Sequence, residues 1–118
     1  MTRPEDPSQV IVVLTTVGSE EQANLISAEL VQRGLAACVN VVPGVKSVYK
    51  WKGKIWQDEE RLLMIKTTSG TFQELRRAIK SLHSYELPEI IALPVELADD
   101  AVLDWIRGSV VGFRKNGA

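Results

Sequence analysis

The sequence predicts an α+β sandwich with the element order βαββαβ and one further helix at the C-terminal end. Three observations lead to this prediction. The stretch "VIVVLTT" at 10–16 is a continuous β-branched run. Two later segments carry apolar residues at helical spacing directly after a serine or a threonine. Between those two segments, residues 35–68 form a long β-type stretch that turns back on itself.

The first strand and helix are predicted over residues 10–16 and roughly 20–33. The β-branched run is typical of a strand buried on both faces, so we expect it at the centre of its sheet. Ser19 with Gln22 three residues later forms a capping box, and Gly34 stands where a helix C-terminal cap belongs. The residues expected on the buried face of this helix are Ala23, Ile26 and Leu30.

Residues 35–51 and 54–68 are predicted to pair as one long hairpin, bent or bulged at Pro43-Gly44. A two-residue turn at Lys52-Gly53 places Tyr49 opposite Trp56, Ser47 opposite Asp58 and Lys46 opposite Glu59. Strands rise about 3.3 Å per residue, so each arm can reach roughly 50 Å, whereas a compact chain of this size has a radius of gyration of about 13 Å. We therefore expect the hairpin to overhang its own domain and to be covered by another subunit.

The second half completes the pattern. Thr71 with Glu74 predicts another capping box, and the helix that follows should end near His83. Residues 87–97, with prolines at 88 and 94, are predicted to form an edge strand, and Asp99 should cap the last helix. The result is a ferredoxin-like sandwich forming one domain over residues 10–109. The prediction leaves a disordered N-terminal tail at 1–9 and a C-terminal tail at 110–118.

Composition excludes several classes of function. The chain has 118 residues, 45% of them hydrophobic and 25% charged, with a formal net charge of -1. We therefore expect no nucleic-acid partner and no membrane partner. The polar start "MTRPEDPSQ" lacks the apolar centre of a secretory signal, and Cys38 is the single cysteine. Both features favour a cytoplasmic location.

Few side chains in this sequence suit metal binding or catalysis. His83, the single histidine, is either a residue at a helix C-terminus or a metal ligand. Cys38 is either a small buried apolar residue or a thiolate ligand. One histidine and one cysteine cannot fill a tetrahedral site, so a metal would also need carboxylates such as Glu59, Glu86 or Glu89, or donors from other subunits. The chain offers no pair of nucleophile and base, so we predict that it is not an enzyme.

The hairpin and its return strand carry further polar candidates. The "QDEE" run at 57–60 is most simply a solvated strand end, although Asp58 or Glu59 could lie at a cleft between subunits. Lys66, inside an apolar strand, either pairs with an acid or holds an anionic ligand. Tyr49, Trp51 and Tyr85 are interpreted as packing or interface residues.

Four stretches taken together resemble the CutA family of divalent-cation tolerance proteins. In chain order they are "GLAACVNVVPGVKSVYKWKGKI", "IKT", "HSYELPEIIALPV" and "LDWI". The resemblance runs from about Val10 to Ser109. It covers the family's "AACVN", "Y-x-W-x-G" and "IKT" motifs, and it departs from the family's "HPYE" at Ser84, where proline is usual. Proline would stiffen the exit from the second helix.

The resemblance implies a ferredoxin-like homotrimer whose long hairpins join neighbouring sheets. It also implies a role in tolerance to divalent metal ions, copper above all, and a likeness to the trimeric PII-like signalling proteins, which bind small effectors between subunits. Residue by residue, the family motifs correspond to Cys38, Tyr49, Trp51, Gly53, Lys66, His83, Tyr85 and Glu86.

Two functional hypotheses follow. The first is a trimeric divalent-cation tolerance protein that binds Cu²⁺ or another divalent ion weakly near subunit clefts. His83 and Cys38 would be its donors, with help from Glu86 or Glu89, and no organic cofactor would be needed. The second is a PII-like module for signalling or protein interaction, with no physiological metal role. Its clefts would bind a small anion through Lys66, with Trp51 and Tyr85 lining the pocket.

Overall fold

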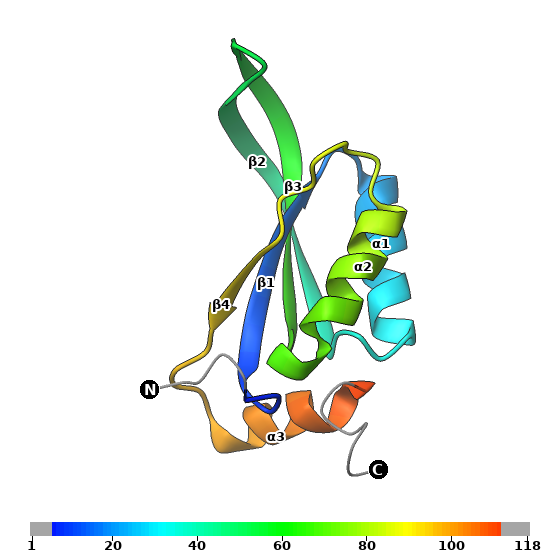
Figure 1. Ribbon diagram of the computed structural model, residues 1–118, viewed down its shortest axis with the longest axis vertical. Helices are drawn as coiled ribbons and strands as arrows, with labels where there is room; N and C mark the ends of the chain where they lie inside the picture. The colour runs from blue at the N-terminus through cyan, green and yellow to red at the C-terminus, as the bar shows by residue number, and fades with distance from the viewer. Residues whose placement is uncertain (1–5, 112–118) are drawn as a thin grey trace.

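The computed structural model describes residues 6–111. It confirms the predicted element order, and Figure 1 shows two helices packed along one side of a twisted sheet with a third helix at its end. The elements are β1 (Val10–Val17), α1 (Glu20–Gln32), β2 (Cys38–Trp51), β3 (Lys54–Thr68), the short 3₁₀ helix η1 (Ser69–Thr71), α2 (Phe72–Leu82), β4 (Ile91–Pro94) and α3 (Asp100–Ser109).

The four strands form one antiparallel sheet in the order β2-β3-β1-β4. As predicted, β1 lies inside the sheet, and β4 lies at an edge. The core forms where the inward side chains of β1 and β3 meet those of α1 and α2. The three predicted residues of α1 are all fully buried there: Ala23, Ile26 and Leu30.

The sheet has two faces of different character. Val13 and Ile65, which are register partners, point towards the helices and are fully buried. Because successive side chains of a strand alternate between faces, the neighbouring residues point the other way. We call this second side the open face, since α1 and α2 lie on the opposite side of the sheet (Figure 1). Its apolar residues are Val12, Leu14, Leu62, Met64, Ile91 and Leu93.

The hairpin formed by β2 and β3 projects well beyond the helices, as the overhang argument predicted (Figure 1). The longest dimension of the molecule is 47 Å. The predicted register is confirmed in full, with Tyr49 opposite Trp56 and Lys46 opposite Glu59. The predicted bulge is also present. Between Val42 and Val45 the register shifts by one residue, and Gly44 adopts a positive φ of 70°.

The last strand is shorter than predicted, because β4 covers only Ile91–Pro94 rather than residues 87–97. Its ladder with β1 ends at the pair Leu14–Ile91. Further along β1, the carbonyl oxygen of Thr16 is hydrogen-bonded to the side chain of His83 at 2.8 Å. Pro88 has no N–H to donate to a ladder. The segment before β4 is therefore an irregular loop, and this loop forms one wall of the candidate site.

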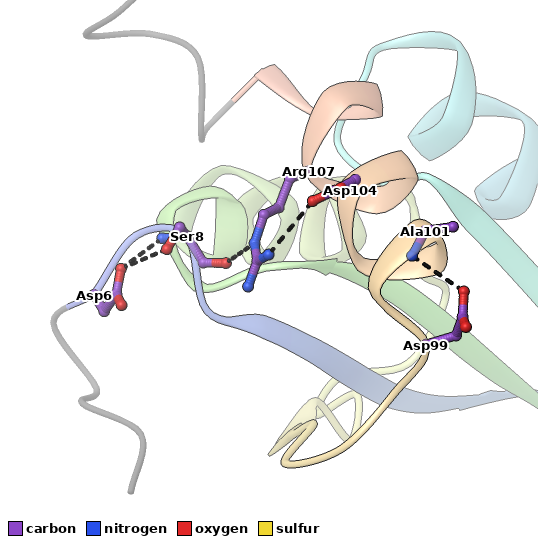
Figure 2. Close-up of polar contacts among 6 residues, drawn as sticks. All are labelled: Asp6, Ser8, Asp99, Ala101, Asp104 and Arg107. Carbon is purple, nitrogen blue, oxygen red and sulfur yellow. Dashed lines mark hydrogen bonds and ion pairs between the residues drawn. The ribbon is translucent and has the colours of Figure 1, made fainter.

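Helix capping differs in part from the prediction. Ser19 and Asp99 cap α1 and α3 as expected, accepting hydrogen bonds from Gln22 N and Ala101 N (Figure 2 shows the second). The predicted box at Thr71 is wrong, because the Thr71 hydroxyl bonds that of Thr68 and η1 precedes α2. A residue already inside a 3₁₀ turn does not have the extended backbone of an N-cap.

The domain is longer than predicted at both ends. Asp6 begins a tight turn in which it accepts two hydrogen bonds from Ser8, and Arg107 Nε donates to the Ser8 carbonyl oxygen at 2.8 Å (Figure 2). Residues 6–9 are therefore docked on α3 and not a tail. At the other end Val110 is fully buried, and Val111 N donates to Gly34 O at 2.9 Å. The remaining predicted tail residues, 1–5 and 112–118, lie outside the described residues.

Candidate functional site: an acidic cleft at the root of the hairpin

A cleft of about 700 Å³ lies between the hairpin and the loop that precedes β4. Most lining residues of the hairpin have their side chains on the face of Tyr49 and Asp58, whereas Val48 belongs to the opposite face. The loop closes the cleft from the other side. The bulge at Pro43-Gly44 gives the hairpin an extra residue and a local bend just before this wall begins. The lining residues are Thr16 from β1, Ser47, Val48, Tyr49, Trp51, Asp58 and Glu60 from the hairpin, and Ser84, Tyr85, Glu86, Leu87 and Glu89 from the loop.

Two tyrosine–carboxylate pairs organise the cleft. Tyr85 Oη donates to Glu60 Oε2 at 2.6 Å, which joins the loop to β3. Tyr49 Oη donates to Asp58 Oδ2, a contact between residues that lie diagonally across the hairpin. Gly18 allows the first pair to form, because a Cβ there would lie 2.9 Å from the Tyr85 hydroxyl oxygen. The cleft thus combines aromatic rings with carboxylates that the rings hold in place.

Both tyrosines are stabilised in the protonated form. Burial, together with the hydrogen bond to Glu60, raises the pKa of Tyr85 well above its ordinary value. The hydrogen bond to Asp58 raises the pKa of Tyr49 in the same direction. A neutral phenol can donate to a carboxylate, whereas a phenolate would repel it. The two phenols therefore keep their protons through the neutral pH range, and each pair is lost when its phenol ionises in alkali.

We expect alkaline titration to report the Tyr85–Glu60 pair. Tyr85 keeps its proton to a higher pH in the folded chain than in the unfolded chain, where its pKa is about 10. The free energy of unfolding should therefore be unaffected below about pH 10 and should fall as the pH rises further towards the folded pKa. Spectrophotometric titration of the phenolate should show a late-titrating group that Tyr85→Phe removes. A wild-type chain whose two tyrosines both titrate near pH 10 would contradict the pairing.

His83 fixes the start of the loop. Its Nδ1 accepts a hydrogen bond from Tyr85 N at 3.1 Å, so the ring proton lies on Nε2, which donates to the carbonyl oxygen of Thr16 at 2.8 Å. The side chain is 8% exposed, and its ring centroid lies 4.6 Å from that of Tyr85. Both ring nitrogens are thus engaged with the backbone, and within one protomer His83 holds the loop against β1.

Ser84 fits the structure in a way that proline would not. Its backbone N–H donates to Gln22 Oε1 at 3.1 Å, a hydrogen bond that requires an N–H. Gln22 Nε2 donates in turn to the carbonyl oxygen of Leu82 at 3.2 Å. Gln22 was predicted to complete the capping box of α1. Its side chain instead connects α1 to the end of α2. These hydrogen bonds restrain the chain where it leaves α2, and proline at position 84 could not donate the one from the backbone N–H.

Cys38 and Lys66 lie elsewhere. They are register partners on the open face, and Val12 occupies the corresponding position of β1. Cys38 Sγ donates to Asn40 Oδ1 at 3.7 Å. Lys66 stands six residues from Glu60 along β3, a separation of roughly 20 Å at the usual rise per residue. Of the three residues proposed for an anion pocket, the structure therefore brings Trp51 and Tyr85 to one cleft and leaves Lys66 outside it.

The predicted metal donors are also divided. Glu86 and Glu89 line the cleft. Cys38 pairs with Lys66 of β3, whereas His83 is bonded to Thr16, whose partner on β3 is Leu62. Lys66 and Leu62 are four residues apart. Four residues of strand correspond to roughly 13 Å, too far for two donors to one ion in the same protomer. Within residues 6–111, no three His, Cys, Asp or Glu side chains gather closely enough to hold a metal ion.

Sequence reasoning missed Glu60 and the roles of the two tyrosines. Glu60 belongs to the "QDEE" run, which suggested a solvated strand end, yet it is only 5% exposed. Its depth follows from a loop far away in the sequence that folds over it. The hairpin register could have indicated this position, because it places Asp58 and Glu60 on the same face of β3 as Trp56.

The fold and the cleft together define a small ferredoxin-like α+β protein with an acidic, aromatic-lined cleft. A family model described as "CutA1 divalent ion tolerance protein" matches residues 11–109. A divalent-cation tolerance protein CutA from Thermus thermophilus is 50% identical over 96 residues, which cover 81% of this chain and 93% of that protein. The chain belongs to the CutA1 divalent ion tolerance family.

Solved structures agree with this assignment. The divalent cation tolerance protein of Thermus thermophilus matches with a TM-score of 0.85 and 47% identity, covering 86% of this chain and 99% of that one. CutA1 from Oryza sativa matches with a TM-score of 0.85 and 40% identity, covering 87% of this chain and 94% of that one. The human relative, Protein CutA, is 44% identical over 101 residues. These span 86% of this chain but only 56% of the human protein.

No helix within the described residues is long and apolar enough to cross a bilayer. Relatives are named for different compartments. The Arabidopsis thaliana protein, of which this chain spans 54%, is named chloroplastic, and the Archaeoglobus fulgidus protein is named periplasmic.

Proposed function

We propose that this protein is a trimeric, non-enzymatic divalent-cation tolerance protein of the cytoplasm that binds divalent ions weakly at clefts between subunits. The observation that carries the proposal is the cleft at the root of the hairpin. Four of its lining residues are carboxylates, namely Asp58, Glu60, Glu86 and Glu89. The basic side chain that reaches its edge is that of Lys52, an exposed residue 3.7 Å from Glu86. Such a lining attracts cations and disfavours the anionic ligand of the alternative hypothesis.

Two features of the surface support a trimer. The open face is apolar, and Leu93 and Ile91 at its β4 edge are 48% and 47% exposed. The projecting hairpin exposes further large apolar side chains, among them Val48, Ile55 and Trp56. Exposed apolar surface of this extent marks an interface. β2 and β4 are the two edges of the sheet, so the β2 edge of one subunit pairing with the β4 edge of the next would close a ring and leave no free edge.

The proposed ion-binding groups lie at the outer part of the cleft. Glu86 and Glu89 are exposed on the loop, and oxygen ligands suit many divalent cations. Two carboxylates make a weak site by themselves, so a neighbouring subunit must supply the remaining donors. Cys38, on the open face, would come to a subunit boundary in the trimer and offers the soft donor that copper prefers. His83 could join only after its ring leaves both backbone partners.

Metal titration of four variants tests this assignment. We expect Cu²⁺ and Mn²⁺ to bind the double variant Glu86→Gln/Glu89→Gln at least about tenfold more weakly than wild type, a loss of about 1.4 kcal/mol. Loss of Cu²⁺ binding in Cys38→Ser would assign that donor, and loss in His83→Ala would assign His83 if the variant keeps the stability of the wild type without metal. The matched control is Glu74→Gln/Glu96→Gln, which removes two exposed carboxylates that do not line the cleft. Affinity should rise with pH because the donors must be deprotonated.

Equal affinities of the wild type and the double variant would remove Glu86 and Glu89 from the mechanism. An absence of binding by the wild type at millimolar ion would remove the metal role altogether and favour the small-ligand module.

A further inference from the structure

The inner end of the cleft holds a carboxylate whose charge the described residues do not balance. Glu60 is 5% exposed and receives a single hydrogen bond, from the neutral hydroxyl of Tyr85. No lysine, arginine or histidine within residues 6–111 forms an ion pair with it. Burying an ionised carboxylate without an opposite charge is costly, and several hydrogen bonds or a cation usually compensate for it. The depth of Glu60 therefore indicates a place for a cation.

The outer end of the same cleft already holds an ammonium group, which belongs to the protein itself. Lys52, at the tip of the hairpin, places its Nζ 5.6 Å from the centroid of the Trp51 ring and 3.7 Å from Glu86 Oε1. An aromatic face and a carboxylate around one ammonium are the usual elements of alkylammonium recognition. Both Lys52 and Glu86 are mostly exposed, so this contact is weak and exchangeable.

The inner end suits an organic cation better than a bare metal ion. Each of its carboxylates, Glu60 and Asp58, already accepts a hydrogen bond from a tyrosine, and no set of three metal-binding side chains is gathered in the described part of the chain. The walls include aromatic rings and the apolar residue Leu87. A volume of about 700 Å³ lies within the usual range for sites that bind small organic molecules.

We propose that the cleft binds a small organic diammonium compound. One ammonium group pairs with Glu60 and Asp58 at the inner end, where Tyr49 and Tyr85 hold the carboxylates in place. The aliphatic body lies against the aromatic rings and Leu87. The second ammonium group takes the position between Trp51 and Glu86 that the Lys52 side chain occupies in the free protein. This inference shares Glu86 with the proposed metal function, but it rests on the inner carboxylates and needs no metal ion.

Calorimetric titration of the full-length, chelator-treated protein tests the proposal. The probes are diaminobutane, its neutral analogue butanediol and its anionic analogue succinate. We expect diaminobutane alone to bind, with an affinity that falls as the salt concentration rises. Glu60→Gln should weaken binding by about tenfold or more while keeping an acceptor for Tyr85. The matched control is Glu59→Gln, one residue along β3 on the opposite face, and its affinity should equal that of wild type.

Two further variants keep the test decisive if Glu60→Gln fails to fold. Trp51→Leu removes the aromatic face without changing the charge and should weaken binding severalfold. Lys52→Gln removes the competing ammonium and should tighten binding. Equal affinity for diaminobutane and butanediol, no binding of diaminobutane, or unchanged affinity in both Glu60→Gln and Trp51→Leu would overturn the proposal. Because no metal is present, failure here leaves the metal titration unaffected, and failure of that titration leaves this result standing.

Discussion

Replacing Leu93 by glutamate is expected to turn the proposed trimer into monomers of 13.1 kDa. Leu93 lies on the open face at the β4 edge and is 48% exposed in the single subunit, so the substitution should leave the subunit fold intact. In a closed ring every subunit repeats the change, so each interface buries one uncompensated carboxylate at a cost of several kcal/mol. About 3 kcal/mol per interface weakens each contact by more than 100-fold. Sedimentation equilibrium at micromolar concentration measures the mass directly.

Leu25→Glu is the matched control for this experiment. Leu25 is also a leucine and is 45% exposed, but it lies on the outer surface of α1, on the helix side of the sheet. Glutamate is tolerated well in a helix, so we expect this variant to keep the mass of the wild type. A wild type that sediments as a stable monomer at micromolar concentration would refute the trimer, and a trimeric Leu93→Glu would exclude the β4 edge from the interface.

His83→Ala is expected to lower the free energy of unfolding by about 2–4 kcal/mol, whether or not a metal ion is present. The substitution leaves the carbonyl of Thr16 and the N–H of Tyr85 without their partners, and it opens a void beside the Tyr85 ring. The cleft should suffer too, because the loop from Ser84 to Glu89 would lose its attachment to β1. Urea unfolding in the presence of a chelator measures the change in stability, with the slope checked for two-state behaviour.

Ser84→Ala serves as the control for the His83 variant. The Ser84 side chain is exposed, and the contact that matters comes from its backbone N–H, which alanine retains. We expect a change within about 0.5 kcal/mol, typical of a surface substitution. If His83→Ala were equally neutral in chelator but abolished copper binding, His83 would be a metal ligand and its two backbone contacts would be incidental.

Local patterns in the sequence were sufficient for most of the fold. The β-branched run of β1, the capping residues Ser19 and Asp99, and the turn at Lys52-Gly53 each depend on neighbours within a few residues, and all appear in the structure. The hairpin register followed from the turn length, because two turn residues determine every pair beyond them. The projection of the hairpin beyond the domain followed from comparing the length of its strands with the size of a compact chain.

Apart from the capping box at Thr71, which a local 3₁₀ turn replaces, the wrong predictions share one cause. The length of β4, the partners of Gln22 and the docking of residues 6–9 on α3 all depend on segments distant in the sequence. A capping box or an edge strand is a local preference, and a tertiary contact of similar free energy can override it. Gln22 illustrates this, since its amide reaches the end of α2, some 60 residues away, instead of its own N-cap.

The elements, their order, the long hairpin and the family could all be predicted from the chain alone, because periodicity, turn chemistry and motif spacing are properties of the chain. The roles of the polar side chains became visible only in the folded protein. There His83 is hydrogen-bonded to the backbone of β1 and is not a free ligand. Glu60 from the "QDEE" run is buried and bonded to Tyr85. The physical reason is that burial and hydrogen-bond partners are set where the loop before β4 folds over the hairpin, a meeting of segments that no local pattern contains.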